Sequence, residues 1–175
     1  EESCTETSLP QDIFISDLCQ KWEAVTAKYP NQNTKTIRLG VVFGNGGGVL
    51  SQMLLPIKMN MVKNIGHGRQ PCVWVHIQDV IRAVEFLMLN ETKESIFNVV
   101  APEKVNQKTF ADIASLILNK KPLFTLPNFI MKWILGEQSQ LVLNGQYVTP
   151  KALQNEGFEF EYPVLKYAIK NLIEK

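Results

Sequence analysis

Hydrophobic residues recur along the chain with two alternating periods, one typical of helices and one typical of strands. Between Asp12 and Tyr29 the apolar positions return every three or four residues, which predicts an amphipathic helix with one buried stripe. The stripe consists of Phe14, Leu18, Trp22 and Val25. From Thr36 to Phe43 a β-rich run carries apolar residues on both faces, which predicts a mostly buried strand.

The alternation continues to about residue 120. A loop over Gly44–Gly48 is predicted to lead into a helix over Val49–Val62 with a break or kink at Pro56. Asn106 suits the N-cap of a later helix, whose apolar stripe is regular. The other predicted elements are strands at Cys72–Ile77 and Ile96–Val100, a helix buried on most sides at Gln78–Leu89, and the stripe Phe110, Ile113, Ala114, Ile117 and Leu118.

After Lys120 short helical patterns dominate. Thr149 and Pro150 form a cap-plus-first-turn signal for a short helix that stops at Gly157. The remaining predictions are a last strand at Pro122–Leu126, a helix at Pro127–Leu135, and a final helix with the stripe Leu165, Ala168, Ile169, Leu172 and Ile173. The fold class expected is α/β, with a body over residues 1–120 and a small helical C-terminal domain over residues 121–175.

Composition describes an ordinary globular chain. The 175 residues are 45% hydrophobic and 20% charged, and the net charge is +1. Because no basic run exceeds Lys120–Lys121, nucleic acid and acidic membranes are not expected partners. The apolar run Met53–Val62 is interrupted by polar residues, so no segment is expected to span a membrane.

The cysteines and the first residues bear on compartment and completeness. Cys4, Cys19 and Cys72 lie far apart without metal-ligand spacing, so reduced thiols in a cytoplasmic compartment are expected. The chain opens on Glu1 with neither a targeting segment nor a strand-like run. It is expected to be the C-terminal part of a longer protein.

The segment from Gly66 to Val80 is the first candidate site. Its glycines permit a close approach or a tight bend, and the Arg69 guanidinium suits phosphate, carboxylate or sugar oxygens. A surface arginine in an ion pair explains Arg69 equally well. His76 and Asp79 suit structural support better than catalysis, and the two histidines lack metal-ligand spacing, so no metal site is expected.

The loop Gly44–Gly48 stands where a dinucleotide fingerprint would, after a strand and before a helix. The third required glycine position is Val49, and no acidic residue follows about 20 residues on. The loop also lacks the Lys-Ser/Thr pair of a phosphate-binding loop. Two interpretations stay open, a flexible turn beside a ligand and a plain surface turn.

Several motifs, in this order, resemble the C-terminal half of NAD(P)-dependent epimerase/dehydratase-like proteins among the extended or atypical short-chain dehydrogenase/reductases. The most similar branch is the epimerase family protein, or family 39U, with its C-terminal domain of unknown function. The body motifs are Thr36–Phe43, Gly46–Gly48, Gly66-x-Gly68-Arg69-Gln70, Trp74–Asp79 and Phe97-Asn98-x-x-Ala101-Pro102. The C-terminal motifs are Gly136-Glu137, Leu143-x-x-Gln146 and Leu153-x-x-x-Gly157-Phe158-x-Phe160.

The resemblance implies a Rossmann-like parallel sheet whose glycine-rich phosphate loop lies in a half not contained in this chain. It implies NADP or NAD as cofactor of the full-length protein, and a small-molecule substrate. The strand end Leu39, Gly40, Val41 and Val42 would line the nicotinamide side. The substrate side would be formed by Gly46, Gly47, Gly48, Met53, Arg69 and Gln70. A homodimer is a further expectation, and Arg38 is expected to need a carboxylate partner.

The family's usual acid/base pair, Tyr-x-x-x-Lys, is not found where the resemblance places it. Aligning Glu23 with the acidic residue that follows the pair puts Ile15 and Cys19 at the two positions. Neither residue supplies the proton transfer, so no catalytic residue is named. Two functions stay open: the substrate-side portion of an oxidoreductase or epimerase, inactive alone, and a non-catalytic nucleotide-binding or interaction protein on the same scaffold.

Overall fold

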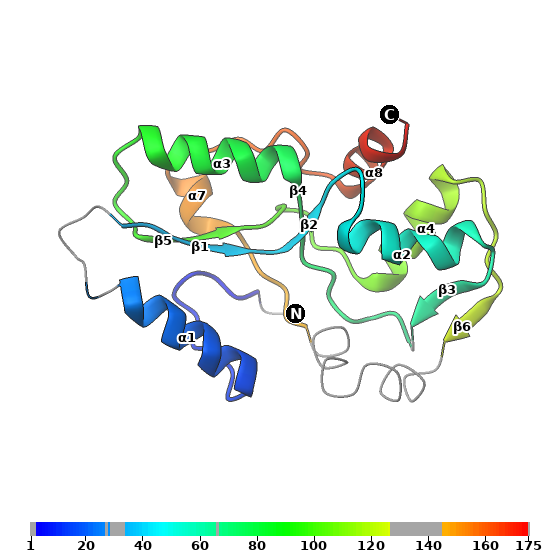
Figure 1. Ribbon diagram of the computed structural model, residues 1–175, viewed down its shortest axis with the longest axis horizontal. Helices are drawn as coiled ribbons and strands as arrows, with labels where there is room; N and C mark the ends of the chain where they lie inside the picture. The colour runs from blue at the N-terminus through cyan, green and yellow to red at the C-terminus, as the bar shows by residue number, and fades with distance from the viewer. Residues whose placement is uncertain (1–2, 27, 29–33, 66, 127–144, 175) are drawn as a thin grey trace.

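The computed structural model describes residues 3–26, 28, 34–65, 67–126 and 145–174, and it forms an α/β fold with parallel strands (Figure 1). Strands and helices alternate through most of the described chain, as the hydrophobic pattern predicts. In chain order the elements are α1 (Phe14–Thr26), β1 (Thr36–Leu39), β2 (Val41–Phe43), α2 (Gly48–Lys58), β3 (Val62–Ile65), β4 (Trp74–His76), α3 (Ile77–Leu89), β5 (Ile96–Val99), α4 (Gln107–Ile117), β6 (Phe124–Leu126), α7 (Lys151–Asn155) and α8 (Leu165–Ile173).

The predicted strand Thr36–Phe43 is divided at Gly40, which corrects the expectation of one buried strand. β1 pairs in parallel with β5, and β2 pairs in parallel with β4. The N–H groups of two successive residues bond to different segments, with Gly40 donating to Val99 O and Val41 to Val73 O. A Cβ at Gly40 would lie 3.1 Å from Val73 O and from Val100 Cγ1, which is tighter than ordinary contact, so the close packing at this point favours glycine.

The helix over Val49–Val62 is shorter than predicted, and a strand follows it. α2 continues past Pro56 and ends at Lys58, so the predicted break does not occur there. Asn60 has a positive φ of 58°, which terminates the helix. Its Oδ1 accepts the Lys121 N–H at 2.9 Å. The chain can then enter β3, which pairs in parallel with β6. The strand β6 was predicted from the sequence, whereas β3 was not.

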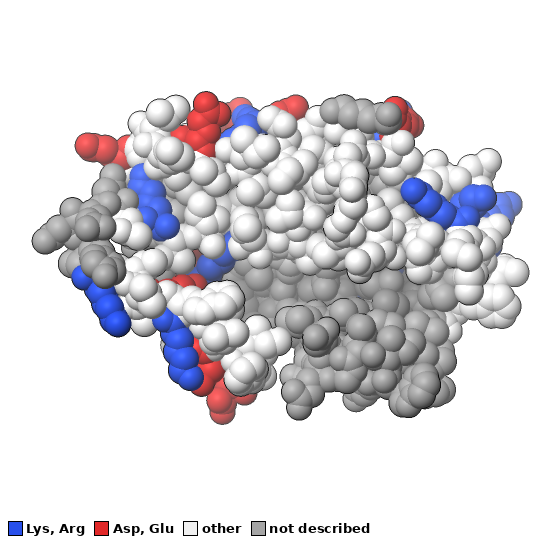
Figure 2. All heavy atoms as spheres, in the orientation of Figure 1, with Lys and Arg blue, Asp and Glu red and all other residues white. Residues whose placement is uncertain are grey.

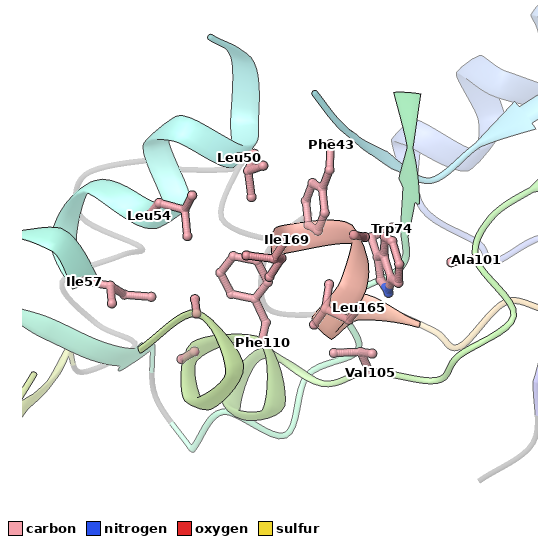
Figure 3. Close-up of a cluster of buried hydrophobic side chains, with 13 residues drawn as sticks. Phe43, Leu50, Leu54, Ile57, Trp74, Ala101, Val105, Phe110, Leu165 and Ile169 are labelled. Atoms are coloured by element: carbon pink, nitrogen blue, oxygen red, sulfur yellow. The ribbon is translucent and has the colours of Figure 1, made fainter. Parts of the chain in front are cut away.

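The main core lies between α2, α4 and α8 (Figure 3). Phe43 stacks on Trp74 with ring centroids 5.7 Å apart, and Phe110 contacts Phe43 at the same centroid distance. The C-terminal helix α8 contributes Leu165 and Ile169 to this cluster, which confirms its predicted stripe. A second buried cluster lies under α3 and includes Val75, Ala83, Leu87, Phe97, Val99, Leu153 and Phe158.

Two predicted helices are correct in position and wrong in burial. No residue of α1 is buried: Phe14 is 83% exposed and Trp22 66% exposed. On α3, Ala83 and Leu87 are buried, but Ile81 is 54% exposed and the helix is therefore not buried on most sides. The hydrophobic period predicts an apolar stripe but not what covers it. No described residue covers the exposed apolar side chains of α1 and α3 named here. Figure 1 shows α3 on one side of the β1–β5 pair and α1 on the other.

Predictions near the remaining helix ends have mixed outcomes. Asn106 is the N-cap of α4, with its Oδ1 accepting the Thr109 N–H at 2.8 Å, as predicted. At α7 the cap position belongs to Pro150 rather than Thr149, and Gly157, with a φ of 87°, follows the helix end. The predicted helix at 127–135 lies outside the described residues.

Candidate functional site

A cavity of about 930 Å³ lies between α1 and β1. α1 contributes Cys19 and Trp22 to its wall, and β1 contributes Ile37 and Leu39. Residues 4, 5 and 8–11, together with Gln146 and Val148, form another part of the wall. The face seen in Figure 2 is hollowed between α1 and the layer above it. Most of the charged side chains on this face lie toward its outline.

An ion pair in the cavity wall engages all three nitrogen atoms of Arg38. Arg38 donates from Nε and Nη2 to the two carboxylate oxygens of Glu23, both at 2.7 Å, and from Nη1 to Glu6 O at 3.1 Å. The hydrogen bonds to Glu23 raise the pKa of Arg38 above its usual value. Arg38 therefore has the carboxylate partner that the sequence predicted. Its guanidinium joins α1 to β1 and is not an open anion site.

The predicted nicotinamide-side residues differ in what they can offer. Leu39 lines the cavity and its side chain is half exposed. The N–H groups of Gly40 and Val41 are already bonded to Val99 O and Val73 O. Because backbone groups alternate between the two edges of a strand, Leu39 and Val42 direct theirs away from β5 and β4. Binding of the nicotinamide side by this strand end stays a prediction.

The predicted substrate-side loop opens toward solvent at the start of α2. Gly46, Gly47 and Gly48 all have positive φ values, of 84°, 145° and 74°, and a Cβ on any of them would meet no atom within 4 Å. Glycine serves the backbone conformation here, not a close contact. Met53, further along α2, packs against the main core cluster. The described part of the cavity wall contains none of these four residues.

The segment around Arg69 is built onto the start of α4. Gly68 O accepts the Lys108 N–H at 2.9 Å, and Gln70 O accepts the Gln107 N–H at 3.0 Å. With the Asn106 cap, these carbonyls satisfy the first N–H groups of the helix, which therefore does not form an anion site. Gly68 has a φ of 69°, and a Cβ there would lie 2.9 Å from Lys108 Cβ.

The two predicted polar side chains of that segment point to different surroundings. Arg69 is exposed, and its N–H donates to His67 Nδ1 at 3.0 Å. Gln70 is buried, with 5% of its surface exposed. Neither Arg69 nor Gln70 is among the described residues that line the cavity, so these predicted substrate residues lie outside its wall. Their binding roles stay predictions.

His76 and Asp79 support the structure, as the sequence indicates. The carboxylate of Asp79 is fully buried and accepts the N–H groups of Glu161 at 2.7 Å and Tyr162 at 2.9 Å. Arg82 Nη1 donates to it at 3.2 Å. The His76 ring stacks on Tyr162 with centroids 3.9 Å apart, and its Nδ1 accepts the Gln78 N–H as the cap of α3. This pair of residues fastens the segment before α8 to the start of α3.

Two further carboxylates hold the C-terminal region, and sequence reasoning missed both. Glu6 Oε1 accepts the N–H groups of Asn98 and Ala152, both at 3.1 Å, which joins the N-terminal segment to β5 and α7. Glu103 Oε2 accepts the Leu165 N–H at 2.6 Å, at the first residue of α8. Neither glutamate stands in a local pattern that marks it, because each partner lies more than 60 residues away.

The remaining candidate chemistry is limited. The three cysteines are free, and burial raises the pKa of the Cys72 thiol to about 12, so it stays protonated at neutral pH. Across the described residues, no group of three or more His, Cys, Asp or Glu side chains is arranged to hold a metal. Within the same residues, no helix has both the length and the apolar character needed to cross a membrane.

Comparison with known proteins gives one consistent family. Residues 126–172 match the model of a domain of unknown function, DUF1731. The chain is 35% identical over 170 residues to an "Epimerase family protein" of Staphylococcus aureus (strain MRSA252), a match that covers 96% of this chain and 56% of the relative. It is 32% identical over 163 residues to "Epimerase family protein SDR39U1" of Mus musculus, covering 91% of this chain and 55% of the relative.

A solved structure agrees with the sequence matches. The crystal structure of human epimerase family protein SDR39U1 (isoform 2) with NADPH superposes with a TM-score of 0.91 at 31% identity, over 99% of this chain and 60% of that chain. The chain thus spans about half the length of the curated relatives it matches. Sequence, C-terminal domain and fold agree in their likeness to the epimerase family proteins of the SDR39U1 type.

Proposed function

We propose that the chain is the substrate-side part of a nicotinamide-dependent oxidoreductase of the epimerase type that acts on a small molecule. The observation that carries the proposal is the fold match over 99% of the chain to a human relative whose structure contains NADPH. Its three free cysteines fit the reducing cytoplasmic compartment expected from the sequence. The cofactor is NADP or NAD, bound mainly by residues outside this chain.

The described residues suit the nicotinamide end of such a cofactor. A bound nicotinamide cofactor would supply hydride transfer. Leu39 offers an apolar side chain at the cavity, and the edge at Leu39 and Val42, which no described strand pairs, offers N–H and C=O groups for the carboxamide. The open loop Gly46–Gly48, with Arg69 and Gln70, is proposed to contact the substrate.

The acid/base position favours a second candidate function. Ile15 and Cys19 occupy the positions where the resemblance expects the Tyr and Lys, and Cys19 lines the cavity on α1. Isoleucine carries no exchangeable proton. The alternative is therefore a nucleotide-binding or interaction protein that uses the same scaffold without turnover.

Cofactor titration tests the proposal. NADPH fluorescence is measured with the chain alone and with the chain joined to the part of the Staphylococcus aureus relative that its match leaves out. We expect binding by the joined protein and little or none by the chain alone. Absence of binding by a folded joined protein at millimolar NADPH would refute the nicotinamide assignment.

Two variants sharpen the result. Leu39→Glu places a charge at the nicotinamide side and is expected to weaken NADPH binding, whereas Arg69→Ala leaves it unchanged and weakens substrate binding. Equal loss of NADPH affinity in both variants contradicts the assigned sides. NADPH oxidation with a panel of small carbonyl compounds separates the two functions, because binding without any oxidation supports the non-catalytic alternative.

A further inference from the structure

Four exposed apolar side chains lie where α2 ends and β6 begins. Met59 and Met61 follow α2 on either side of Asn60, and Leu123 and Phe124 lie at the start of β6. Each of the four is more than half exposed. The two segments are more than 60 residues apart in the sequence, so only the fold brings this apolar surface together.

Two turns of the same kind hold this end of the molecule in shape. Asn60 after α2 and Asn119 after α4 have positive φ values of 58° and 51°, so each helix is followed by a left-handed residue. Asn60 Oδ1 accepts the Lys121 N–H at 2.9 Å, and Met61 O accepts the Phe124 N–H at 3.3 Å. Hydrogen bonds between the two segments therefore fix the backbone that carries the exposed apolar side chains.

Lysines lie beside these apolar side chains, in two stretches of sequence without acidic residues. Lys58 is the last residue of α2, and Lys120 and Lys121 lie between α4 and β6; all three are exposed. The sequence contains no Asp or Glu over residues 24–78 or 113–136. Figure 2 shows blue and white surface without red at the right-hand end, where α2 and α4 end in Figure 1. The basic pole is defined here as these three lysines together with the four apolar side chains.

A purely structural explanation covers only part of the basic pole. A lysine in the last turn of a helix interacts favourably with the helix dipole, which accounts for Lys58. It does not account for Leu123 and Phe124, because exposing large apolar side chains to water is unfavourable. Exposed apolar residues that are grouped and rimmed by charged residues mark a contact surface.

We propose that the basic pole binds the surface of an anionic lipid bilayer. The lysines contact the lipid phosphates and the apolar side chains enter the headgroup region, since a weak hydrophobic anchor and a basic patch reinforce each other. This differs from the prediction made from the sequence, which counted only the run Lys120–Lys121; the fold adds Lys58 from the end of α2. No residue of the basic pole lines the described wall of the cavity, so the proposal does not depend on the cofactor.

Other occupants fit the basic pole less well. A second copy in a two-fold contact would set these lysines against the same lysines. The basic pole lies at one end of the long axis in Figure 1, which limits the area that a protein partner buries, whereas a standard interface buries about 800 Å² on each side. A bilayer requires no matching shape. Since no helix among the described residues is long and apolar enough to cross a membrane, the proposed contact is peripheral.

Sedimentation with lipid vesicles tests the proposal. The chain is mixed with vesicles of phosphatidylcholine alone or of phosphatidylcholine with phosphatidylserine, up to millimolar lipid. We expect binding to the anionic vesicles only, and weaker binding at high salt because salt screens surface charges. Absence of binding to the anionic vesicles, or equal binding to both kinds, overturns the proposal. Binding to soluble polyglutamate as tight as to the anionic vesicles assigns the basic pole to an acidic protein and overturns it as well.

Two pairs of variants map the surface, each with a matched control. Lys121→Gln is expected to weaken vesicle binding about fivefold, and the control Lys166→Gln, at an exposed lysine of α8, leaves it unchanged. Leu123→Ser is expected to weaken it by at least about tenfold. Its control is Leu89→Ser on α3, because Leu123 is 84% exposed and Leu89 77% exposed. Circular dichroism checks that the variants fold.

The variants also decide against the other occupants. Equal effects of a variant and its control contradict the assigned surface. A chain that elutes as a dimer in gel filtration, and as a monomer after Leu123→Ser, shows a contact between two copies and overturns the proposal.

Methionine oxidation tests the entry of the apolar side chains without any substitution. Hydrogen peroxide converts exposed methionine to its sulfoxide, which mass spectrometry of the peptides measures. Met59 and Met61 are expected to oxidise several-fold more slowly when the chain is bound to anionic vesicles. Met88, which is exposed on α3, is the internal control and is expected to oxidise at the same rate with and without vesicles. Unchanged rates at Met59 and Met61 in the bound chain overturn the proposal.

Discussion

Asp79→Asn tests the fastening of the C-terminal region at its most buried point. The side chain keeps its size, but one carboxylate oxygen becomes an amino group. Since Glu161 N–H and Tyr162 N–H each donate to a different oxygen of Asp79, one of these donors then faces another donor. A hydrogen bond to a charged group contributes about 1.5–3 kcal/mol, and an unsatisfied buried donor costs about 1–3 kcal/mol. We expect the free energy of unfolding to fall by about 3 kcal/mol.

Two controls separate this effect from simple loss of charge. Arg82→Gln removes the ion pair with Asp79, but the Arg82 side chain is 36% exposed, so the loss is expected to be about 1 kcal/mol. Asp17→Asn alters an exposed carboxylate, paired with Lys21 at 3.8 Å, and is expected to cost less than about 0.5 kcal/mol.

The assay is urea unfolding followed by tryptophan fluorescence, with amide exchange at Glu161 and Tyr162 as a local readout. These two amides are expected to lose protection in Asp79→Asn before the rest of the chain unfolds. A loss of less than about 1 kcal/mol, or unchanged protection of the two amides, would refute the assigned role of the buried carboxylate.

Four further outcomes are expected. Glu6→Gln keeps the oxygen that accepts both N–H groups and is expected to cost less than about 1 kcal/mol in urea unfolding, whereas Glu6→Ala loses both bonds and costs about 2 kcal/mol; equal losses contradict this geometry. Gly68→Ala combines a positive φ with a Cβ 2.9 Å from Lys108 and is expected to destabilise the chain more than Gly46→Ala, where the space is open; the reverse order contradicts the packing. Iodoacetamide at pH 8 is expected to modify the exposed Cys19 much faster than Cys72, whose thiol pKa is about 12; mass spectrometry of the labelled peptides decides. Because an unfolded thiol ionises near 9, the Cys72 contribution to stability is complete below that pH and declines as the pH rises toward 12, a slope that Cys72→Ala removes.

Local signals predicted local structure well. The Asn106 cap and the stripe of α8 depend on residues within a few positions, and both are confirmed. The end of α2 depends on the left-handed conformation of Asn60, which the run of apolar residues conceals. The division at Gly40 depends on β4, which lies more than 30 residues further along the chain. Short-range sequence patterns do not report the pairing with β4, whereas the Asn60 signal is local and the prediction of a helix to Val62 overlooked it.

The candidate site shows the same division. The sequence pointed to Leu39, which lines the cavity, and to structural roles for Arg38, His76 and Asp79. It did not show that Gly68 and Gln70 accept hydrogen bonds from the start of α4, because those contacts join residues 37–40 positions apart. The burial of α1 was predicted wrongly, since a stripe carries no information on which chain segment covers it.

The two bonds of Glu6 also set an order of events during synthesis. Glu6 needs Asn98 and Ala152, which follow it by 92 and 146 residues, and the neighbouring bridge joins Cys4 to Val148. At about 5–20 residues per second, a ribosome takes roughly 7–30 s to make the intervening chain. Until the end of that interval the segment around Glu6 lacks at least one of these three partners. Its docking is therefore among the last steps that complete the fold, because it requires that α7 has been made.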